Sequence, residues 1–262
     1  MTAHVDVRTS GAIQIIRLVR PEKKNALTGA MYRILADALA AGDKNDEVAA
    51  QVILGSGGVF SAGNDIADFM QAAQSGKGLG DDVTRFITAL ATVEKPLLAG
   101  VDGRAVGIGT TMLFHCDLVY ATPAAQFSTP FLDLGLVPEA GSSLLLPRLI
   151  GYQRAFEMLV LGAVFSADRA RECGFVNHVV EAGALEDRVL EAAARLAAKP
   201  PEALSMARRL LKGAPQQLTA QMREEERLFS ERARSPEAVE AFRAFLEKRP
   251  ANFGRARGVG EA

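Results

Sequence analysis

Short apolar segments alternate with helical patterns through the first two thirds of this chain of 262 residues, and no other feature constrains the fold as strongly. The segments are rich in β-branched or other apolar residues and are bounded by turn-forming residues, which is typical of buried strands. Strands are expected at residues 4–8, 12–19, 51–54, 97–101, 117–120, 126–128 and 175–180. Helices are expected between them, at residues 28–41, 81–92 and 108–115. This order predicts an α/β fold whose sheets are covered by helices.

The C-terminal part of the sequence is predominantly helical. Pro200 and Pro201 end an Ala-rich helical stretch, Pro215 begins another helix, and Ser235-Pro236 is an N-cap followed by proline at the first helical position. In the helix after Pro215, the charged run at residues 223–226 is interpreted as a solvated face. The sequence is therefore divided into an α/β core, residues 1–197, and a C-terminal helical region, residues 198–262.

Composition excludes several classes of function. The 30 Lys and Arg nearly cancel the 31 Asp and Glu, so broad binding of nucleic acid is not expected. No apolar run is long enough to cross a membrane, so no membrane partner is expected either. Two Cys and three His are too few for a disulfide framework or a zinc ribbon, and no metal site is expected. The N-terminus lacks an apolar signal segment, and the expected location is the reducing cytoplasm.

Two glycine-rich turns are the first candidates for chemistry. Each follows a strand and leads into a helix, at residues 60–66 and 103–111. Backbone N–H groups at the start of a helix have no partner within the helix, and two of them directed at one oxygen form an oxyanion hole. Taken singly, each turn is also compatible with an ordinary connection between a strand and a helix.

Three charged side chains elsewhere in the sequence, those of Glu139, Lys23 and Lys24, allow both a structural and a functional interpretation. Glu139 precedes a helix, where it could cap the helix N-terminus or act as a buried general base. Lys23 and Lys24 lie in a loop that could be merely solvated or could contact phosphate. His115 and Asp117 adjoin apolar segments and are interpreted as structural residues.

Taken together, these segments resemble the crotonase superfamily, the enoyl-CoA hydratases and isomerases. The resemblance extends from about residue 5 to about residue 250, nearly the whole chain. It rests on residues 20–27 (RPEKKNAL), 60–65 (FSAGND), 103–109 (GRAVGIG), Cys116-Asp117 with residues 125–127 (AQF), and 134–138 (LGLVP).

This resemblance implies a fold, an assembly and a ligand. The fold is a spiral of ββα repeats followed by a C-terminal helical region that mediates trimer formation, so a homotrimer or a dimer of trimers is expected. The ligand is an acyl-CoA thioester, and no cofactor is expected apart from the coenzyme A of the substrate.

The resemblance also assigns roles to residues of this sequence. The backbone N–H groups of Asn64 and Ile108 would form the oxyanion hole. The residues expected to bind the CoA part or to line the substrate site are Lys23, Lys24, Ala26, Ala62, Gly63, Asp65, Ile66, Gly107 and Phe131.

The sequence departs from the hydratases of the superfamily at two positions. They add water with two glutamates, and these positions hold Thr111 and Phe131 here. Glu139 instead matches the acidic residue of the type II Δ3,Δ2-enoyl-CoA isomerases, in a similar Pro-Glu-Ala-x-Ser-Ser setting. The expected function is therefore the conversion of 3-enoyl-CoA to 2-enoyl-CoA in fatty acid metabolism, with Glu139 as base. The alternatives are hydration or another crotonase-type reaction, and a non-catalytic acyl-CoA-binding subunit.

Overall fold

The computed structural model describes residues 4–66 and 80–256 of the chain. The strands are β1 (Val5–Ser10), β2 (Ile13–Leu18), β3 (Ala50–Leu54), β4 (Leu97–Val101), β5 (Arg104–Val106), β6 (Leu118–Ala121), β7 (Gln126–Ser128), β8 (Phe165–Ser166) and β9 (His178–Val179). The α-helices are α1 (Gly29–Lys44), α3 (Asp81–Thr92), α4 (Ile108–Thr111), α5 (Ser142–Ile150), α6 (Tyr152–Leu159), α7 (Ala167–Cys173), α8 (Leu185–Ala197), α9 (Pro201–Lys212), α10 (Pro215–Arg232), α11 (Pro236–Glu247) and α12 (Phe253–Ala256). Short 3-10 turns are η1 (Pro21–Lys23), η2 (Met112–His115), η3 (Leu132–Leu134) and η4 (Ala182–Ala184).

The main sheet has six strands in the order β1-β2-β3-β4-β6-β9. β1 and β2 form an antiparallel hairpin, and every further neighbouring pair is parallel. Parallel neighbours require crossover connections, which α1 and α3 supply between β2, β3 and β4. The carboxyl ends of these parallel strands lie at one edge of the sheet.

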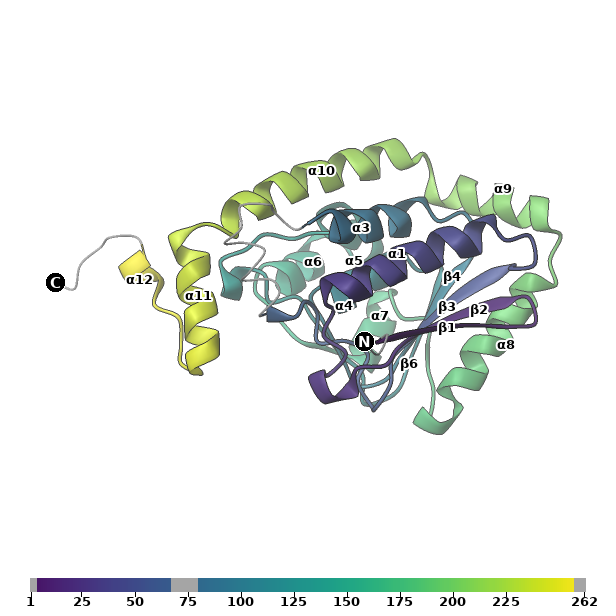
Figure 1. The fold of residues 1–262 in the computed structure, drawn as a ribbon, viewed down its shortest axis with the longest axis horizontal. Coiled ribbons are helices and arrows are strands. Elements are labelled where there is room, and N and C mark those ends of the chain that lie inside the picture. Colours follow the sequence, from purple (N-terminus) through teal and green to yellow (C-terminus); the bar gives the residue numbers. More distant parts are fainter. Residues whose placement is uncertain (1–3, 67–79, 257–262) are drawn as a thin grey trace.

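Alternate residues of each strand point to opposite faces of the sheet, and in the central strands β2, β3 and β4 both faces are buried. On one face, Ile15, Val52 and Leu98 pack against Leu185 and Val189 of α8. On the other face, residues such as Ile16, Ile53 and Ala99 join the larger cluster formed with α1 and α3. Figure 1 shows α8 on one side of the sheet, and α1 and α3 on the other.

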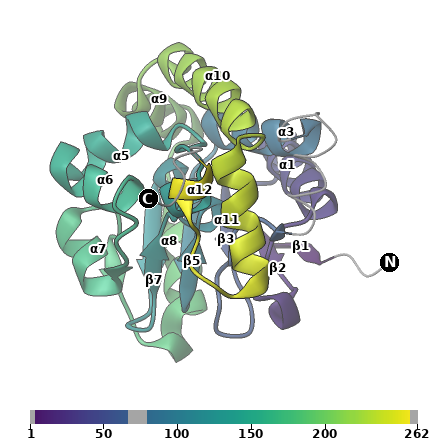
Figure 2. The ribbon, with the colours of Figure 1, turned by 90° about the vertical axis from the view of Figure 1, so that its left-hand side faces the viewer.

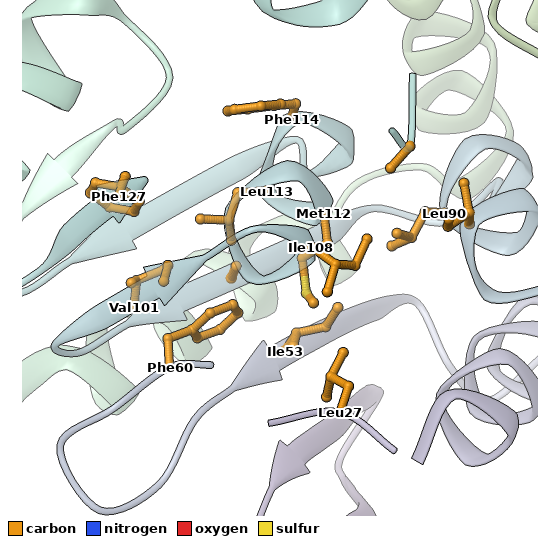
Figure 3. Packing of buried hydrophobic residues seen from close by; sticks show 14 of the residues in the cluster. Leu27, Ile53, Phe60, Leu90, Val101, Ile108, Met112, Leu113, Phe114 and Phe127 are labelled. Atoms are coloured by element: carbon orange, nitrogen blue, oxygen red, sulfur yellow. The ribbon is translucent and has the colours of Figure 1, made fainter. Parts of the chain in front are cut away.

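A second, three-stranded sheet, β5-β7-β8, lies beside α4 and helps to hold it in place. The apolar side chains of Phe60, Ile108 and Phe127 are fully buried in the main cluster. Figure 3 shows Phe60, Ile108, Met112 and Ile53 side by side within this packing. The start of the first glycine-rich turn, at Phe60, and the helix that follows the second, at Ile108, are therefore anchored in the core.

The C-terminal helices α9, α10 and α11 pack against the outside of the core at separate places. α9 is fastened by Asp117, which accepts hydrogen bonds from Arg208 at 2.8 Å and from the backbone N–H of Leu97 at 2.8 Å. α10 then crosses over α3 and α5, and α11 packs at the far end against η3 (Figures 1 and 2). The division at residues 197 and 198 stays a prediction, although α8 ends at Ala197 and α9 begins at Pro201.

Most of the expected elements are present, including the helix that Thr28 caps and the helix that begins at Pro236. The expected strand at residues 175–180 was wrong in its extent, because only His178 and Val179 pair with β6. The backbone N–H groups of Phe175 and Val176 bond to the carbonyl of Ala170 and close α7 instead. The ring of Phe175 then packs edge-on against Phe114 and Phe127, which accounts for its apolar character.

The ion pair between Asp117 and Arg208 is expected to matter for stability. Asp117→Ala would leave the nearly buried guanidinium of Arg208 without its carboxylate, and should lower the free energy of unfolding by about 3 kcal/mol. Glu191→Ala, which breaks an exposed pair with Arg188, should cost less than about 1 kcal/mol. Urea unfolding of both variants measures this difference, and equal losses would contradict the role given to Asp117.

Candidate active site

The two glycine-rich turns lie directly against each other. The N–H groups of Phe60 and Ser61 donate to the carbonyl of Arg104, and the N–H of Val106 donates to the carbonyl of Ser61 at 2.9 Å. A side chain at Gly63 would meet the carbonyl oxygen of Val106 at 2.8 Å, and φ at Gly63 is +86°. Glycine is therefore required where the first turn approaches the second.

Each turn presents a backbone donor at this contact. Leu27 pairs with the first turn through the carbonyl of Gly63 and the N–H of Asp65, so the N–H of Asn64 points away from Leu27. Ile108 is the first residue of α4, where an N–H has no partner within the helix. Within residues 4–66 and 80–256, neither the N–H of Asn64 nor that of Ile108 has an acceptor. Both N–H groups are therefore available to a ligand oxygen within the described residues, and their joint role as an oxyanion hole stays a prediction.

Glu139 lies next to the helix that Ile108 begins. Its side chain is only 4% exposed, and Thr111, one turn after Ile108, donates a hydrogen bond to its carboxylate at 2.5 Å. Tyr32 of α1 donates to the side-chain oxygen of Asn64 and is also close enough to Glu139 to be affected by its charge. The structure therefore gathers Asn64, Ile108 and Glu139 from three distant parts of the sequence.

Burial changes the ionisation of this acid. The pKa of Glu139 is raised to about 8: removal from water is the main cause, the Thr111 hydrogen bond opposes the shift, and the negative charge of Glu225 adds to it. Burial, followed by the charge of Glu139, also raises the pKa of Tyr32 well above its ordinary value. A carboxyl group with a pKa near neutrality can both accept and return a proton.

A cavity of about 340 Å³ opens at Glu139 between α3 and α10. Its walls are mixed apolar and hydroxyl-bearing, with two further charged groups; the lining includes Thr84, Ile87, Thr88, Ala140, Thr219, Met222, Arg223 and Glu226. Glu226 accepts a hydrogen bond from Thr84 at 2.6 Å and is a second carboxylate here that the sequence did not single out. The cavity is large enough for a small acyl group.

The capping interpretation of Glu139 was wrong. α5 begins after its N-cap, Gly141, and the N–H groups of Gly141 and Ser143 donate to the carboxylate of Glu225 on α10. The sequence interpretation of residues 223–226 as a solvated face was also wrong for Glu225, which is 4% exposed. A signal was available, since Met222 and Phe229 are spaced from Glu225 so that all three share one face of α10.

The basic loop is attached to the first turn. Lys23 and Lys24 are exposed, and the carbonyl of Lys24 accepts a hydrogen bond from the N–H of Ala62 at 2.9 Å. The buried Asn25 amide donates to the carbonyls of Ser56 and Val59, which fixes this loop against the chain that leads into the turn. Both lysines thus lie close to the segment that carries Ala62 and Gly63.

The remaining predicted binding residues do not form one continuous group, and several of them have structural contacts. The carboxylate of Asp65 pairs with Arg20 at 2.7 Å, so it helps to hold the turn. Ala26 accepts a hydrogen bond from Arg20 through its carbonyl, Ile66 packs against the main apolar cluster, and Gly107 precedes Ile108 with a φ of +55°. Phe131 is buried in the main apolar cluster and does not line the cavity at Glu139. Its place in the substrate site stays a prediction.

A family model described as enoyl-CoA hydratase/isomerase matches residues 8–256. The chain belongs to this family. It is 37% identical over 204 residues to 4-chlorobenzoyl coenzyme A dehalogenase-1 of Arthrobacter sp, covering 75% of this chain and 73% of that one. It is 35% identical over 249 residues to enoyl-CoA delta isomerase 2 of Rattus norvegicus, covering 93% of this chain and 63% of the relative.

Solved structures agree with the family assignment. The structure of an enoyl-CoA hydratase/isomerase from Pseudoalteromonas atlantica T6c superposes with a TM-score of 0.89 at 36% identity, covering 95% of this chain and 99% of that one. The predicted crotonase-type fold is therefore confirmed. Relatives named as isomerase, hydratase and dehalogenase match at similar identity, so the comparisons establish an acyl-CoA enzyme family and leave the particular reaction to the site.

Two observations concern the expected absences. Every helix in the described ranges is too short or too polar to cross a membrane. Within the same ranges, no three His, Cys, Asp or Glu side chains gather as metal ligands.

The buried acid makes stability depend on pH. Because the pKa of Glu139 is raised on folding, its contribution is fully present below the unfolded pKa and is lost as pH rises through about 8. Glu139→Gln removes this loss, so the variant should gain more than about 1 kcal/mol relative to the wild type between about pH 5 and about pH 9. Urea unfolding at both pH values measures the gain. A difference that does not change with pH, as expected for the exposed Glu191→Gln, would contradict the shifted pKa.

Proposed function

We propose that the protein isomerises 3-enoyl-CoA to 2-enoyl-CoA, with Glu139 as the single base. The observation that supports this most strongly is the gathering of one buried, high-pKa carboxyl group beside two backbone donors that have no acceptor in the described part of the chain. A base close to an oxyanion hole is suited to removing a proton next to a thioester carbonyl.

The proposed reaction has two proton transfers. With the thioester oxygen against the N–H groups of Asn64 and Ile108, the Glu139 carboxylate takes a proton from C2, and the electron pair moves to the oxygen to give a dienolate. One such donor can contribute about 3 kcal/mol to stabilising the negative charge. Glu139 then returns the proton to C4, and the double bond moves from C3–C4 to C2–C3.

The surroundings of Glu139 favour isomerisation over the addition of water. Hydration in the manner of the superfamily's hydratases would need carboxylates at positions 111 and 131, which are Thr and Phe. The Thr111 hydroxyl instead binds Glu139 and orients it. Coenzyme A is expected to enter as part of the substrate, with Lys23 and Lys24 near its phosphates and the turn at residues 62–66 near its adenine.

Glu139→Gln should reduce turnover of 3-hexenoyl-CoA by at least about a hundredfold, because glutamine cannot carry the proton. Glu226→Gln is the matched comparison, since it changes another carboxylate of the same cavity and should reduce turnover far less. The assay follows formation of 2-hexenoyl-CoA and, in parallel, hydration of crotonyl-CoA and release of chloride from 4-chlorobenzoyl-CoA.

Several outcomes would overturn this proposal. Retained isomerisation in Glu139→Gln would show that Glu139 is not the base. Faster hydration than isomerisation by the wild type would favour a hydratase, and chloride release would favour a dehalogenase. Binding of acyl-CoA without turnover of any of the substrates would indicate a non-catalytic acyl-CoA-binding subunit.

The pH dependence of kcat/KM offers a separate check. Only the ionised form of Glu139 can take the proton, so kcat/KM should rise about tenfold for each pH unit below about 8 and level off above it. Rates of isomerisation from about pH 6 to about pH 9 measure the profile. A rate that is constant over this range would exclude Glu139, with its raised pKa, as the base.

A homotrimer or a dimer of trimers stays part of the proposal. Large apolar side chains exposed on α9 and α11 support it: Leu210, Leu211, Phe245 and Leu246. The cytoplasmic location and the place in fatty acid metabolism stay predictions of the same kind.

A further inference from the structure

The carboxylate of Glu225 binds the backbone segment that follows Glu139. It accepts hydrogen bonds from the N–H of Gly141 at 2.5 Å, from the N–H of Ser143 at 3.0 Å, and from the Ser143 hydroxyl. Gln221, one turn earlier on α10, donates to the same hydroxyl at 2.9 Å. These contacts join residues about eighty positions apart along the chain.

The segment held in this way has an unfavourable local conformation. Ala140 and Gly141 both adopt left-handed backbone angles, with φ of +57° and +73°. A non-glycine residue such as Ala140 rarely adopts this conformation, and it persists only where the surroundings enforce it. The side chains of Leu218 and Met222 pack against Gly141 on the side that faces α10, where a Cβ would lie 2.5 Å from Leu218.

A second contact holds the segment from the opposite side. The buried His115 ring donates from Nε2 to the carbonyl of Ala140 at 2.7 Å, and the carbonyl of His115 accepts from Lys212 at 2.6 Å. Burial lowers the pKa of His115 to about 4, so the ring stays neutral near neutral pH. The peptide after Glu139 is thus held between η2 of the core and α10 of the C-terminal region.

Capping alone does not explain an acid at position 225. A buried charge costs free energy that a neutral Ser or Asn cap would avoid. Burial raises the pKa of Glu225 itself, and the hydrogen bonds from Ser143 and Gly141 oppose that shift. The charge that the site retains lies close enough to Glu139 to disfavour its ionisation.

We propose that Glu225 is a positioning residue for Glu139: its carboxylate fixes the backbone of residues 140–143 and thereby directs the Glu139 side chain toward Thr111 and the cavity. The inference rests on the proposed function in taking Glu139 as the base. It also makes the base dependent on α10, so the C-terminal helical region acts on the chemistry of the core.

Kinetics of three variants test this role. Glu225→Ala should reduce kcat for 3-hexenoyl-CoA by about a hundredfold with little change in KM, because it displaces the base and leaves the coenzyme A loop untouched. Glu225→Gln keeps one acceptor oxygen and should recover part of kcat. Glu231→Gln, an exposed acid on the same helix, should match the wild type. Equal losses in Ala and Gln variants, or a loss confined to KM, would overturn the proposal.

The pH profile of Glu225→Gln gives a readout that a purely structural role would not change. The titratable groups that face Glu139 in the described structure are Tyr32 of α1 and Glu225 of α10, with Arg223 and Glu226 of α10 lining the same cavity and His115 of η2 bonded to the next peptide. Loss of the Glu225 charge should shift the midpoint of kcat/KM toward lower pH. An unchanged midpoint would contradict the electrostatic part of the role.

Unfolding measurements separate this inference from the proposed function. The wild type, Glu139→Gln, Glu225→Gln and the double variant form a cycle, whose coupling is measured at about pH 5, where Glu139 is uncharged and repulsion between the two acids does not contribute. A coupling different from zero supports the positioning role even if no substrate is isomerised. Additive effects in the cycle would overturn it even if isomerisation is observed.

Discussion

The contact between the two glycine-rich turns determines the rest of the site. Backbone hydrogen bonds from Phe60, Ser61 and Val106 join the turns, and Gly63 allows the first to touch the carbonyl of Val106. Phe60 at the start of the first turn and Ile108 at the end of the second are buried in the core, and the hydrogen bonds between the turns hold the backbone of Asn64 and Ile108 before any ligand binds. A preorganised pair of donors stabilises developing charge without the cost of reorganising in the reaction.

The environment of Glu139, the proposed base, follows from a second constraint, the burial of acids where the C-terminal helices cover the core. Glu139 is withdrawn from water under α10, and Glu225 of that helix binds the backbone directly after it. Thr111 and His115 hold the same segment from the α4–η2 side. In the proposed function, coenzyme A binding and the choice of reaction therefore depend on different parts of the fold: the first on the loops around residues 23–26 and 62–66, the second on residues 139–143.

Sequence patterns predicted those features of the fold that depend on interactions between residues close in sequence. The Thr28 cap, the proline start of α11 and both glycine-rich turns depend on residues close in sequence, and each was predicted from it. The role of Glu225 depends on α10 meeting residues 141–143, which no local pattern encodes, and its acidic neighbours favoured a solvated interpretation. Phe175 shows the same limit, since its apolar character reflects packing against Phe114 and Phe127 and not strand pairing.

The transfer of a labelled proton tests the central claim most directly. When 3-hexenoyl-CoA that carries deuterium at C2 is isomerised in ordinary water, a single buried carboxylate should return part of the label to C4 of the product. Mass spectrometry of the 2-hexenoyl-CoA locates the label. Deuterium at C4 in the wild type is the result that a shuttle through Glu139 predicts, and complete loss of the label to water would contradict it.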